Sequence, residues 1–262
     1  MPKHKHKNTV LDMSRSNGAS CSKEMTDCSP VVYQKEKLTR PLSISKRPLT
    51  DRQHEFLDLV LDKKCKMIFV NGPAGSSKTF MAIYAGLTLM SDKKLSDIIY
   101  IRSAVESADY SLGFLPGEMK DKLDPYLQPL EEKLEELLPK QDITMLKKES
   151  RLIPQPIGFA RGLNWNAKCI IADEAQNFST RELTTLITRT GEFSKVFICA
   201  DPSQSDINGK SGFLPIMNQF NDEESRANGI YCFEFFEEDI VRSALVKFII
   251  TRINSLKKQP VI

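Results

Sequence analysis

Eight consecutive residues have the types and spacing of a phosphate-binding loop: Gly72, Pro73, Ala74, Gly75, Ser76, Ser77, Lys78 and Thr79. The motif G-x-x-x-x-G-K-[ST] has glycine where this chain has Ser77. Backbone N–H groups at a helix start bind phosphate oxygens, Lys78 would add a charge near the outer phosphates, and Thr79 would bind Mg²⁺. The alternative is an ordinary Gly-Pro turn. The strand-like residues before the loop and the helix-like residues after it favour the phosphate site.

A pair of acids, Asp173 and Glu174, ends an apolar run in "CIIADEAQNFS". In phosphoryl transfer such a pair holds magnesium and primes water, so Asp173 would accept hydrogen bonds from the metal's water shell and Glu174 would polarise the attacking water. A solvated turn would have the same composition. The position at the carboxyl end of a second strand favours the chemical role.

A third apolar run, "VFICADPSQSD", ends in Asp201, with Gln204 three residues later. A glutamine beside a γ-phosphate can position water or sense the nucleotide. Asp, Pro and Ser are also turn formers, so this segment taken alone predicts only a turn. Taken together with the first two segments it favours a site, because all three loops would face the same end of a parallel sheet.

These loops need a parallel sheet to bring them together. Strand-like runs occupy 67–70, 97–102, 151–157, 168–173, 195–200 and 229–236, and prolines interrupt the run at 151–157, so we expect its strand to be short. Helix-like patterns occupy 78–90, 126–138, 180–190 and 238–253, and a further helix begins at Thr50 or Asp51 with Phe56, Leu57, Val60 and Leu61 on its apolar face. Alternating strands and helices predict a three-layer α/β fold with a mostly parallel sheet, whose strands end at one edge.

Composition predicts one folded domain and a basic tail. The chain has 262 residues with a net charge of +3, and residues 1–50 alone carry ten Lys and Arg against four Asp and Glu. Residues 1–46 contain few apolar side chains and no periodicity, which predicts disorder. There is neither a secretory signal nor a membrane-spanning run, so we expect a cytoplasmic protein with no membrane partner.

The six cysteines do not predict a metal site or disulfides. Cys169 and Cys199 lie in apolar strand-like runs, where cysteine is usually an inert hydrophobe. The alternative is a zinc site in the tail. Its ligands would be His4, His6, Cys21 and Cys28, but their spacing fits no zinc template and favours a disordered tail.

Together these segments resemble the PhoH family of ATPases. The resemblance spans residues 49–253 and is carried by "GPAGSSKT", "GFLPG", "KLDPYLQPL", "FARGLNWNAKCIIADEAQN", "TRTGEFSKVFICADPSQSDI", "KSGF" and "FEEDIVRSALV". It implies a RecA-like P-loop NTPase similar to the first domain of superfamily-one helicases. It also implies ATP and Mg²⁺ as ligands, ATP hydrolysis, a link to RNA or single-stranded DNA, and a homo-oligomer, with hexameric rings expected. The domains would be a tail at 1–46, the ATPase domain at 47–256 and a short tail at 257–262.

The resemblance also implies roles for single residues. Gln53 would read adenine through two hydrogen bonds, and Gln204 would sense the γ-phosphate. Lys78, Glu174, Gln204 and Arg242 would form the catalytic set, with Arg242 as an arginine finger that acts across a subunit boundary. Thr79 and Asp173 would hold the metal. Arg189 is a second finger candidate, for which a surface salt bridge is the favoured alternative.

A nucleic-acid surface is the weaker expectation. Arg102 and Arg161 match positions that contact the strand backbone in related helicases, and Phe159 and Trp165 would offer stacking surfaces. Core aromatics and surface arginines explain the same residues equally well. The basic segment from Lys3 to Arg47 would add non-specific affinity, and its deletion would leave ATP turnover unchanged.

Two further readings of the loop remain. Ser77 in place of glycine is compatible with a nucleotide-gated binding module of negligible turnover. A small-molecule kinase would need an acceptor pocket and an arginine-rich lid, which the sequence does not show. Glu174 in the water-priming position favours hydrolysis by an Mg²⁺-dependent ATPase.

Overall fold

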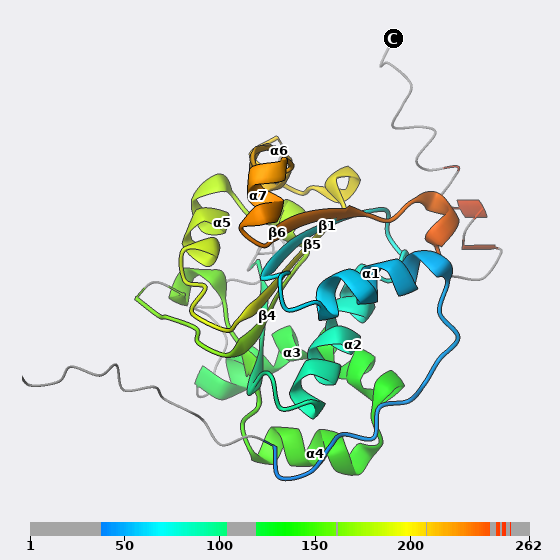
Figure 1. The fold of residues 1–262 in the computed structure, drawn as a ribbon, viewed down its shortest axis with the longest axis vertical. Helices are drawn as coiled ribbons and strands as arrows, with labels where there is room; N and C mark the ends of the chain where they lie inside the picture. The colour runs from blue at the N-terminus through cyan, green and yellow to red at the C-terminus, as the bar shows by residue number, and fades with distance from the viewer. Residues whose placement is uncertain are drawn as a thin grey trace, which may run out of the picture. The chain divides into compact units, whose positions relative to one another are not determined.

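A sheet of six parallel strands forms the centre of the protein in the computed structural model (Figure 1). The structure describes residues 38–103, 119–160, 162–207, 209–241, 245–246, 248–249 and 252, with only the backbone at 119–126 and 159. In chain order the strands are β1 (Met67–Asn71), β2 (Asp97–Arg102), β3 (Leu152–Pro154), β4 (Lys168–Asp173), β5 (Lys195–Ala200) and β6 (Ile230–Glu234).

The strand order β3-β2-β4-β5-β1-β6 places β5 between β1 and β4. Every pairing in the sheet is parallel, and the register aligns Asn71 with Ala200 and Arg102 with Asp173. The carboxyl ends of four adjacent strands therefore lie at one edge. The predicted α/β class and mostly parallel sheet are confirmed.

Helices cover both faces of this sheet. They are α1 (Asp51–Leu61), α2 (Lys78–Ser91), α3 (Met119–Leu137), α4 (Lys140–Lys148), α5 (Thr180–Ile187), α6 (Phe213–Gln219) and α7 (Glu223–Ala227). The alternating side chains of β1 show the two layers: Ile68 and Val70 are buried with α1 to α4, whereas Phe69 is buried with α5 and α6. Both faces of the strands are apolar because both are covered.

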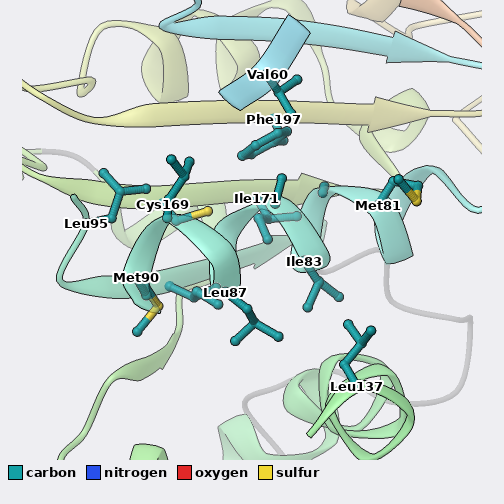
Figure 2. Packing of buried hydrophobic residues seen from close by; sticks show 14 of the residues in the cluster. Val60, Met81, Ile83, Leu87, Met90, Leu95, Leu137, Cys169, Ile171 and Phe197 are labelled. Atoms are coloured by element: carbon teal, nitrogen blue, oxygen red, sulfur yellow. The ribbon is translucent and has the colours of Figure 1, made fainter. Parts of the chain in front are cut away.

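The layer beneath α2 fixes the position of the loop that precedes this helix. Ile83 and Leu87 of α2, Cys169 of β4 and Phe197 of β5 are fully buried side chains that belong to one cluster. Figure 2 shows Ile83 and Leu87 on the side of α2 that faces Leu137 of α3, and Cys169 on the side of its strand that faces α2. Gly86 faces the same strand, and a Cβ there would lie 2.7 Å from the Cys169 sulfur. The glycine thus permits the close approach of α2 to the sheet.

Helix α1 begins as the sequence predicts. Thr50 is the cap residue: its hydroxyl accepts a hydrogen bond from the Gln53 backbone N–H, and the Gln53 side chain accepts from the Thr50 N–H. This reciprocal pair satisfies two N–H groups that the first helical turn leaves unpaired. Phe56 and Val60 are fully buried on the expected apolar face.

The strand in 151–157 is short, as its prolines predict: β3 has three residues, because Pro154 and Pro156 lack the N–H that a sheet requires. Other boundaries differ from the prediction. Helix α3 begins at Met119 rather than at 126. Helices α4, α6 and α7 have nine, seven and five residues, which is too short for apolar periodicity to predict them.

The helix expected at 238–253 does not begin at Glu238. A 3-10 turn, η5 (Glu237–Asp239), is followed by extended backbone at Ile240. Residues 245, 246, 248, 249 and 252 are helical. None of the helices that the structure describes has the length and apolar content to cross a membrane.

Residues 38–46, which were expected to belong to the disordered tail, pack against the core instead. We call residues 38–49 the strap. Leu38 and Leu42 are 2% and 7% exposed and belong to the same buried cluster as α1 to α4. Two leucines among many polar residues give no periodic signal, so only the packed structure shows that the segment is held.

The strap is anchored by a single buried acid of α4. The carboxylate of Asp142, whose side chain is fully buried, accepts from Arg40 at 2.5 Å and from the Ser43 backbone N–H at 2.8 Å. The Ser45 N–H also donates to the Leu137 carbonyl at 2.8 Å. These bonds fix the strap backbone against α3 and α4.

We expect Asp142→Ala to lower the free energy of unfolding by about 1–3 kcal/mol, because it leaves the Ser43 N–H and the Arg40 guanidinium without their acceptor. Urea denaturation followed by circular dichroism would measure this. Asp58→Ala, at an exposed position on α1, is the matched control with an expected change within about 0.5 kcal/mol. Equal stability of the two variants would contradict the anchoring role of Asp142.

Candidate functional site

A cavity of about 610 Å³ lies at the carboxyl edge of the sheet. The predicted phosphate loop, acidic pair and third turn all contribute to its lining, through residues such as Lys78, Asp173, Glu174 and Gln204. The parallel register explains this, since β1, β4 and β5 end together. Ligand sites in open parallel sheets commonly occupy this edge.

The predicted phosphate loop connects β1 to α2. Gly72 has φ of 158°, and a Cβ there would lie 2.8 Å from the Phe235 carbonyl oxygen. Gly75 has φ of 81°, in the left-handed region. These two positions therefore require glycine, one for a close approach of backbone and one for its conformation.

Ser77 adopts the conformation for which glycine is the favoured residue. It caps α2 with φ of 65° and ψ of 17°, in the left-handed region, and its side chain makes no capping hydrogen bond. The first N–H groups of α2 are therefore not taken by a Ser77 cap and face an anion-binding position at a helix N-terminus. The serine retains the loop geometry at the cost of backbone strain.

Lys78 folds back over the loop. Its ammonium donates to the Gly72 and Pro73 carbonyls at 2.7 and 2.8 Å. Burial lowers the pKa of the Lys78 ammonium, and the nearby Asp201 carboxylate partly opposes this shift. An anion bound beside Lys78 would favour its charged form in the same way.

Asp173 connects the acidic pair to the phosphate loop. Its side chain accepts from the Thr79 hydroxyl at 2.6 Å and from the Tyr100 hydroxyl at 2.5 Å. Burial, followed by the nearby Asp173 charge, raises the pKa of the Tyr100 phenol, which therefore remains a proton donor. The carboxylate is thus held between two hydroxyl groups that come from α2 and β2.

Glu174 is held on a strained turn. It has φ of 53° and ψ of 40°, and its carboxylate accepts from the Gln176 side chain at 2.6 Å. The Arg102 guanidinium lies 3.7 Å from Glu174 and 4.0 Å from Asp173. The Glu174 side chain remains 40% exposed.

The third turn is joined to the acidic pair by Gln176. The Gln176 amide donates to Glu174 and its carbonyl accepts from the Asp201 N–H at 3.0 Å, so one buried side chain connects the ends of β4 and β5. Gln204 follows in the 3-10 turn η4 (Pro202–Gln204) and is exposed on the cavity lining. A position beside a bound phosphate is compatible with this placement.

The residues present fit a magnesium ion that is bound together with phosphates. Among the described residues, no group of three or more His, Cys, Asp or Glu could hold a metal ion. Mg²⁺ commonly uses one or two protein ligands and completes its shell with water and substrate phosphates. The hydroxyl of Thr79 and the carboxylate of Asp173, 2.6 Å apart, are such a pair of oxygen donors.

Gln53 lines the same cavity from the start of α1. It is 5% exposed, and its side-chain oxygen accepts from the Thr50 N–H at 3.0 Å. The helix cap therefore fixes the orientation of the amide. A carbonyl oxygen has two lone pairs, so the predicted pairing with adenine remains compatible with this bond.

Other predicted residues are not brought to the cavity. Trp165 is 6% exposed and packs in the core, so the prediction that it offers a stacking surface is wrong. Arg189 does not line the cavity, and its Nε has no hydrogen-bond partner among the described residues. Arg242, Arg161 and the side chain of Phe159 lie outside the described residues.

Three residues of the site were not predicted in these roles: Tyr100, Arg102 and Gln176. Arg102 was expected at a nucleic-acid surface, yet it lies against the acidic pair. Its position at the end of the strand-like run 97–102 was the available signal, because neighbouring parallel strands end at the same edge. Tyr100 had no signal, since a tyrosine within an apolar run is normally a core residue.

Comparison with known proteins matches residues 45–254 to the PhoH family, described as PhoH-like protein. A PhoH-like protein of Bacillus subtilis (strain 168) is 33% identical over 221 residues, which are 84% of this chain and 67% of that protein. A PhoH-like protein of Mycobacterium tuberculosis (strain ATCC 25618 / H37Rv) is 32% identical over 206 residues, 78% of this chain and 56% of that protein.

The protein PhoH of Escherichia coli (strain K12) is 28% identical over 241 residues, 90% of this chain and 62% of that protein. The chain thus spans 56 to 67% of the length of these three relatives. Among solved structures, the chain is similar to the Sulfolobus solfataricus SWI2/SNF2 ATPase core in complex with dsDNA. The match covers 76% of this chain and 47% of the chain in that structure. Its sequence identity to this chain is 15% and its TM-score is 0.41.

We expect Ser77→Gly and Ser76→Gly to change stability in opposite directions. Ser77→Gly relieves a left-handed backbone and raises the free energy of unfolding by up to about 1 kcal/mol. Ser76→Gly removes a fully buried side chain that donates to the Pro73 carbonyl at 2.8 Å. We expect this to lower the free energy of unfolding by about 1–2 kcal/mol. Urea denaturation of both variants measures the effect, and a loss of stability in Ser77→Gly would contradict the strain at this position.

Proposed function

The chain belongs to the family of PhoH-like proteins, and on that premise we propose that it binds ATP with Mg²⁺ in the cavity and hydrolyses the ATP. The observation that carries the proposal is the 2.6 Å hydrogen bond between Thr79 and Asp173, which are 94 positions apart. It joins a phosphate loop to an acidic pair, as phosphoryl transfer requires.

The phosphate loop would hold the triphosphate through charge and backbone donors. The N–H groups at the start of α2 and the Lys78 ammonium supply positive charge within one turn of helix. Lys78 would exchange its two backbone carbonyl partners for phosphate oxygens. The buried position of Lys78 strengthens this attraction, because water screens it less.

Thr79 and Asp173 would hold Mg²⁺, which supplies neutralisation of the phosphate charge when bound. Tyr100 would act as a positioning residue, because its hydroxyl fixes one carboxylate oxygen of Asp173. Hydrogen-bonded partners of metal ligands orient those ligands and tune their affinity. The other carboxylate oxygen of Asp173, which accepts from the Thr79 hydroxyl, would then bind the metal beside that hydroxyl.

Glu174 would accept a proton from the attacking water. Its carboxylate is partly exposed and is held by Gln176 and Arg102. Gln176 also contacts the backbone of Asp201, so a movement of the third turn would be transmitted to Glu174. Gln204, on that turn, would report the γ-phosphate to the same network.

The arginine that stabilises the transferred phosphoryl group remains a prediction. The Val241 N–H donates to the Gly75 carbonyl at 3.1 Å, so Arg242 directly follows a residue in contact with the phosphate loop. Supply of this arginine by a neighbouring subunit in a ring, coupling to RNA or single-stranded DNA, and a cytoplasmic location are further predictions. They rest on the family resemblance and on composition.

A nucleotide-gated binding module is the second candidate function. Two observations favour it: Ser77 strains the phosphate loop, and the Glu174 carboxylate is engaged by Gln176 and Arg102. Such a protein would bind ATP in the same way and release it unchanged. Single-turnover hydrolysis of bound ATP separates the two functions.

We expect Lys78→Ala and Glu174→Gln to separate binding from hydrolysis. Lys78→Ala should weaken ATP binding about tenfold or more, because it removes a charged donor. Glu174→Gln should keep ATP affinity within about twofold while single-turnover hydrolysis falls roughly 10²- to 10⁴-fold. Calorimetry and rapid-quench assays measure these values, with Lys63→Ala on the surface as the control. Wild-type binding without turnover would support the gated module instead.

We expect Tyr100→Phe to raise the Mg²⁺ concentration needed for half-maximal nucleotide binding by about tenfold. The substitution keeps the buried ring and removes only the hydroxyl that fixes Asp173. Titration of fluorescent ATP binding with Mg²⁺ measures the effect, and Tyr231→Phe on β6 is the matched control. An unchanged Mg²⁺ requirement would show that Tyr100 has a purely structural role.

A further inference from the structure

Part of the cavity wall has no role in phosphate binding. Besides the phosphate loop and the acidic residues, the lining includes Arg47, Pro48 and Leu49 of the strap, together with Gln53 of α1 and Phe80 of α2. These side chains offer an aromatic ring, a guanidinium plane, aliphatic surface and one amide. That combination is suited to a flat heterocycle with polar edges.

Arg47 is held in place by α3. Its guanidinium donates to the Glu136 backbone carbonyl at 2.8 Å and lies 3.6 Å from the Glu136 carboxylate. The same guanidinium lies 5.8 Å from the centroid of the Phe80 ring. The side chain is still 45% exposed, so a planar face remains accessible to a ligand.

The charges on this wall disfavour a second anion. Glu136 pairs with both Arg47 and Lys133, the latter at 3.1 Å, and Glu132 also lines the cavity. The two cations are thus opposed by two carboxylates. A neutral nucleobase fits this wall better than a phosphate, for which Lys78 and the start of α2 provide the positive end of the cavity.

The strap places these residues through bonds remote from the cavity. Asp142 holds Arg40 and the Ser43 N–H, and Leu38 and Leu42, which flank Arg40 in the sequence, are buried. The position of Arg47 therefore depends on a backbone that is anchored on both sides, by these contacts and by the Thr50 cap of α1.

We propose that Arg47 and Phe80 form, with Gln53, the wall that binds the nucleobase, and that the strap thereby sets the affinity for the base of the nucleotide. The base packs against the guanidinium and the aromatic ring, while Gln53 hydrogen-bonds its edge. This inference rests on the proposed nucleotide binding. It changes the expectation for the tail, because a deletion that includes Arg47 removes part of the site.

The test compares a nucleotide with a ligand that has the phosphates and no base. Calorimetry in the presence of Mg²⁺ measures the Kd of ATP and of inorganic tripolyphosphate for the full chain. We expect Arg47→Ala to weaken ATP binding about five- to tenfold, with tripolyphosphate affinity unchanged within about twofold. Arg47→Lys should weaken ATP binding to a similar degree, because lysine keeps the charge and loses the planar face.

Two further variants complete the experiment. Phe80→Leu should also weaken ATP binding and leave tripolyphosphate affinity unchanged. If Arg47→Ala does not fold, Phe80→Leu and Arg47→Lys together test the proposal. Lys46→Ala removes the adjacent exposed charge, which does not line the cavity, and should leave both affinities unchanged.

The outcomes separate this inference from the proposed function. Suppose that Arg47→Ala and Phe80→Leu bind ATP as the wild type does, or that their affinities for ATP and tripolyphosphate fall equally. Arg47 and Phe80 then do not bind the base, while the proposed nucleotide binding stands. If the wild type binds neither ligand, the proposed function fails and the wall fails with it. A loss of affinity that is confined to ATP supports base binding by Arg47 and Phe80.

Discussion

The hydrogen bond from Thr79 to Asp173 is the contact on which the rest of the site depends. It exists because a parallel sheet brings the ends of β1 and β4 to one edge, with β5 between them. Tyr100 completes the arrangement from β2. A loop and an acid pair that are distant in sequence are therefore held within hydrogen-bonding distance by strands that are covered on both faces, and the covering layers make this edge rigid.

Two of the six described non-glycine residues with positive φ lie at this edge. Ser77 and Glu174 both adopt left-handed conformations, and each directly precedes the first residue of a helix or 3-10 turn. Non-glycine residues in this region cost about 1–2 kcal/mol each. Burial of apolar side chains in the surrounding core offsets this free energy, since α2 packs on fully buried residues of β4 and β5. Such strain is characteristic of turns that present groups to a ligand.

The cavity also depends on a segment outside the sheet. The strap contributes Arg47 to the lining and is fixed by the buried carboxylate of Asp142. Residues near the start of the described chain thus share one surface with α2 and α3. This arrangement links the order of the strap to the shape of the cavity, although the predicted phosphate loop lies elsewhere in the chain.

Sequence alone determined the sheet, the glycine-containing loop before α2 and the two acidic turns, because their signals are local: apolar runs, a glycine-containing loop and acids at strand ends. Tertiary structure decided the remainder. Arg102 pairs with the acids, Gln176 bridges two turns, Trp165 is buried, and the strap packs. Each of these outcomes depends on contacts between residues that are far apart in the chain. No local pattern encodes which partner a polar or aromatic side chain will meet once the layers have packed.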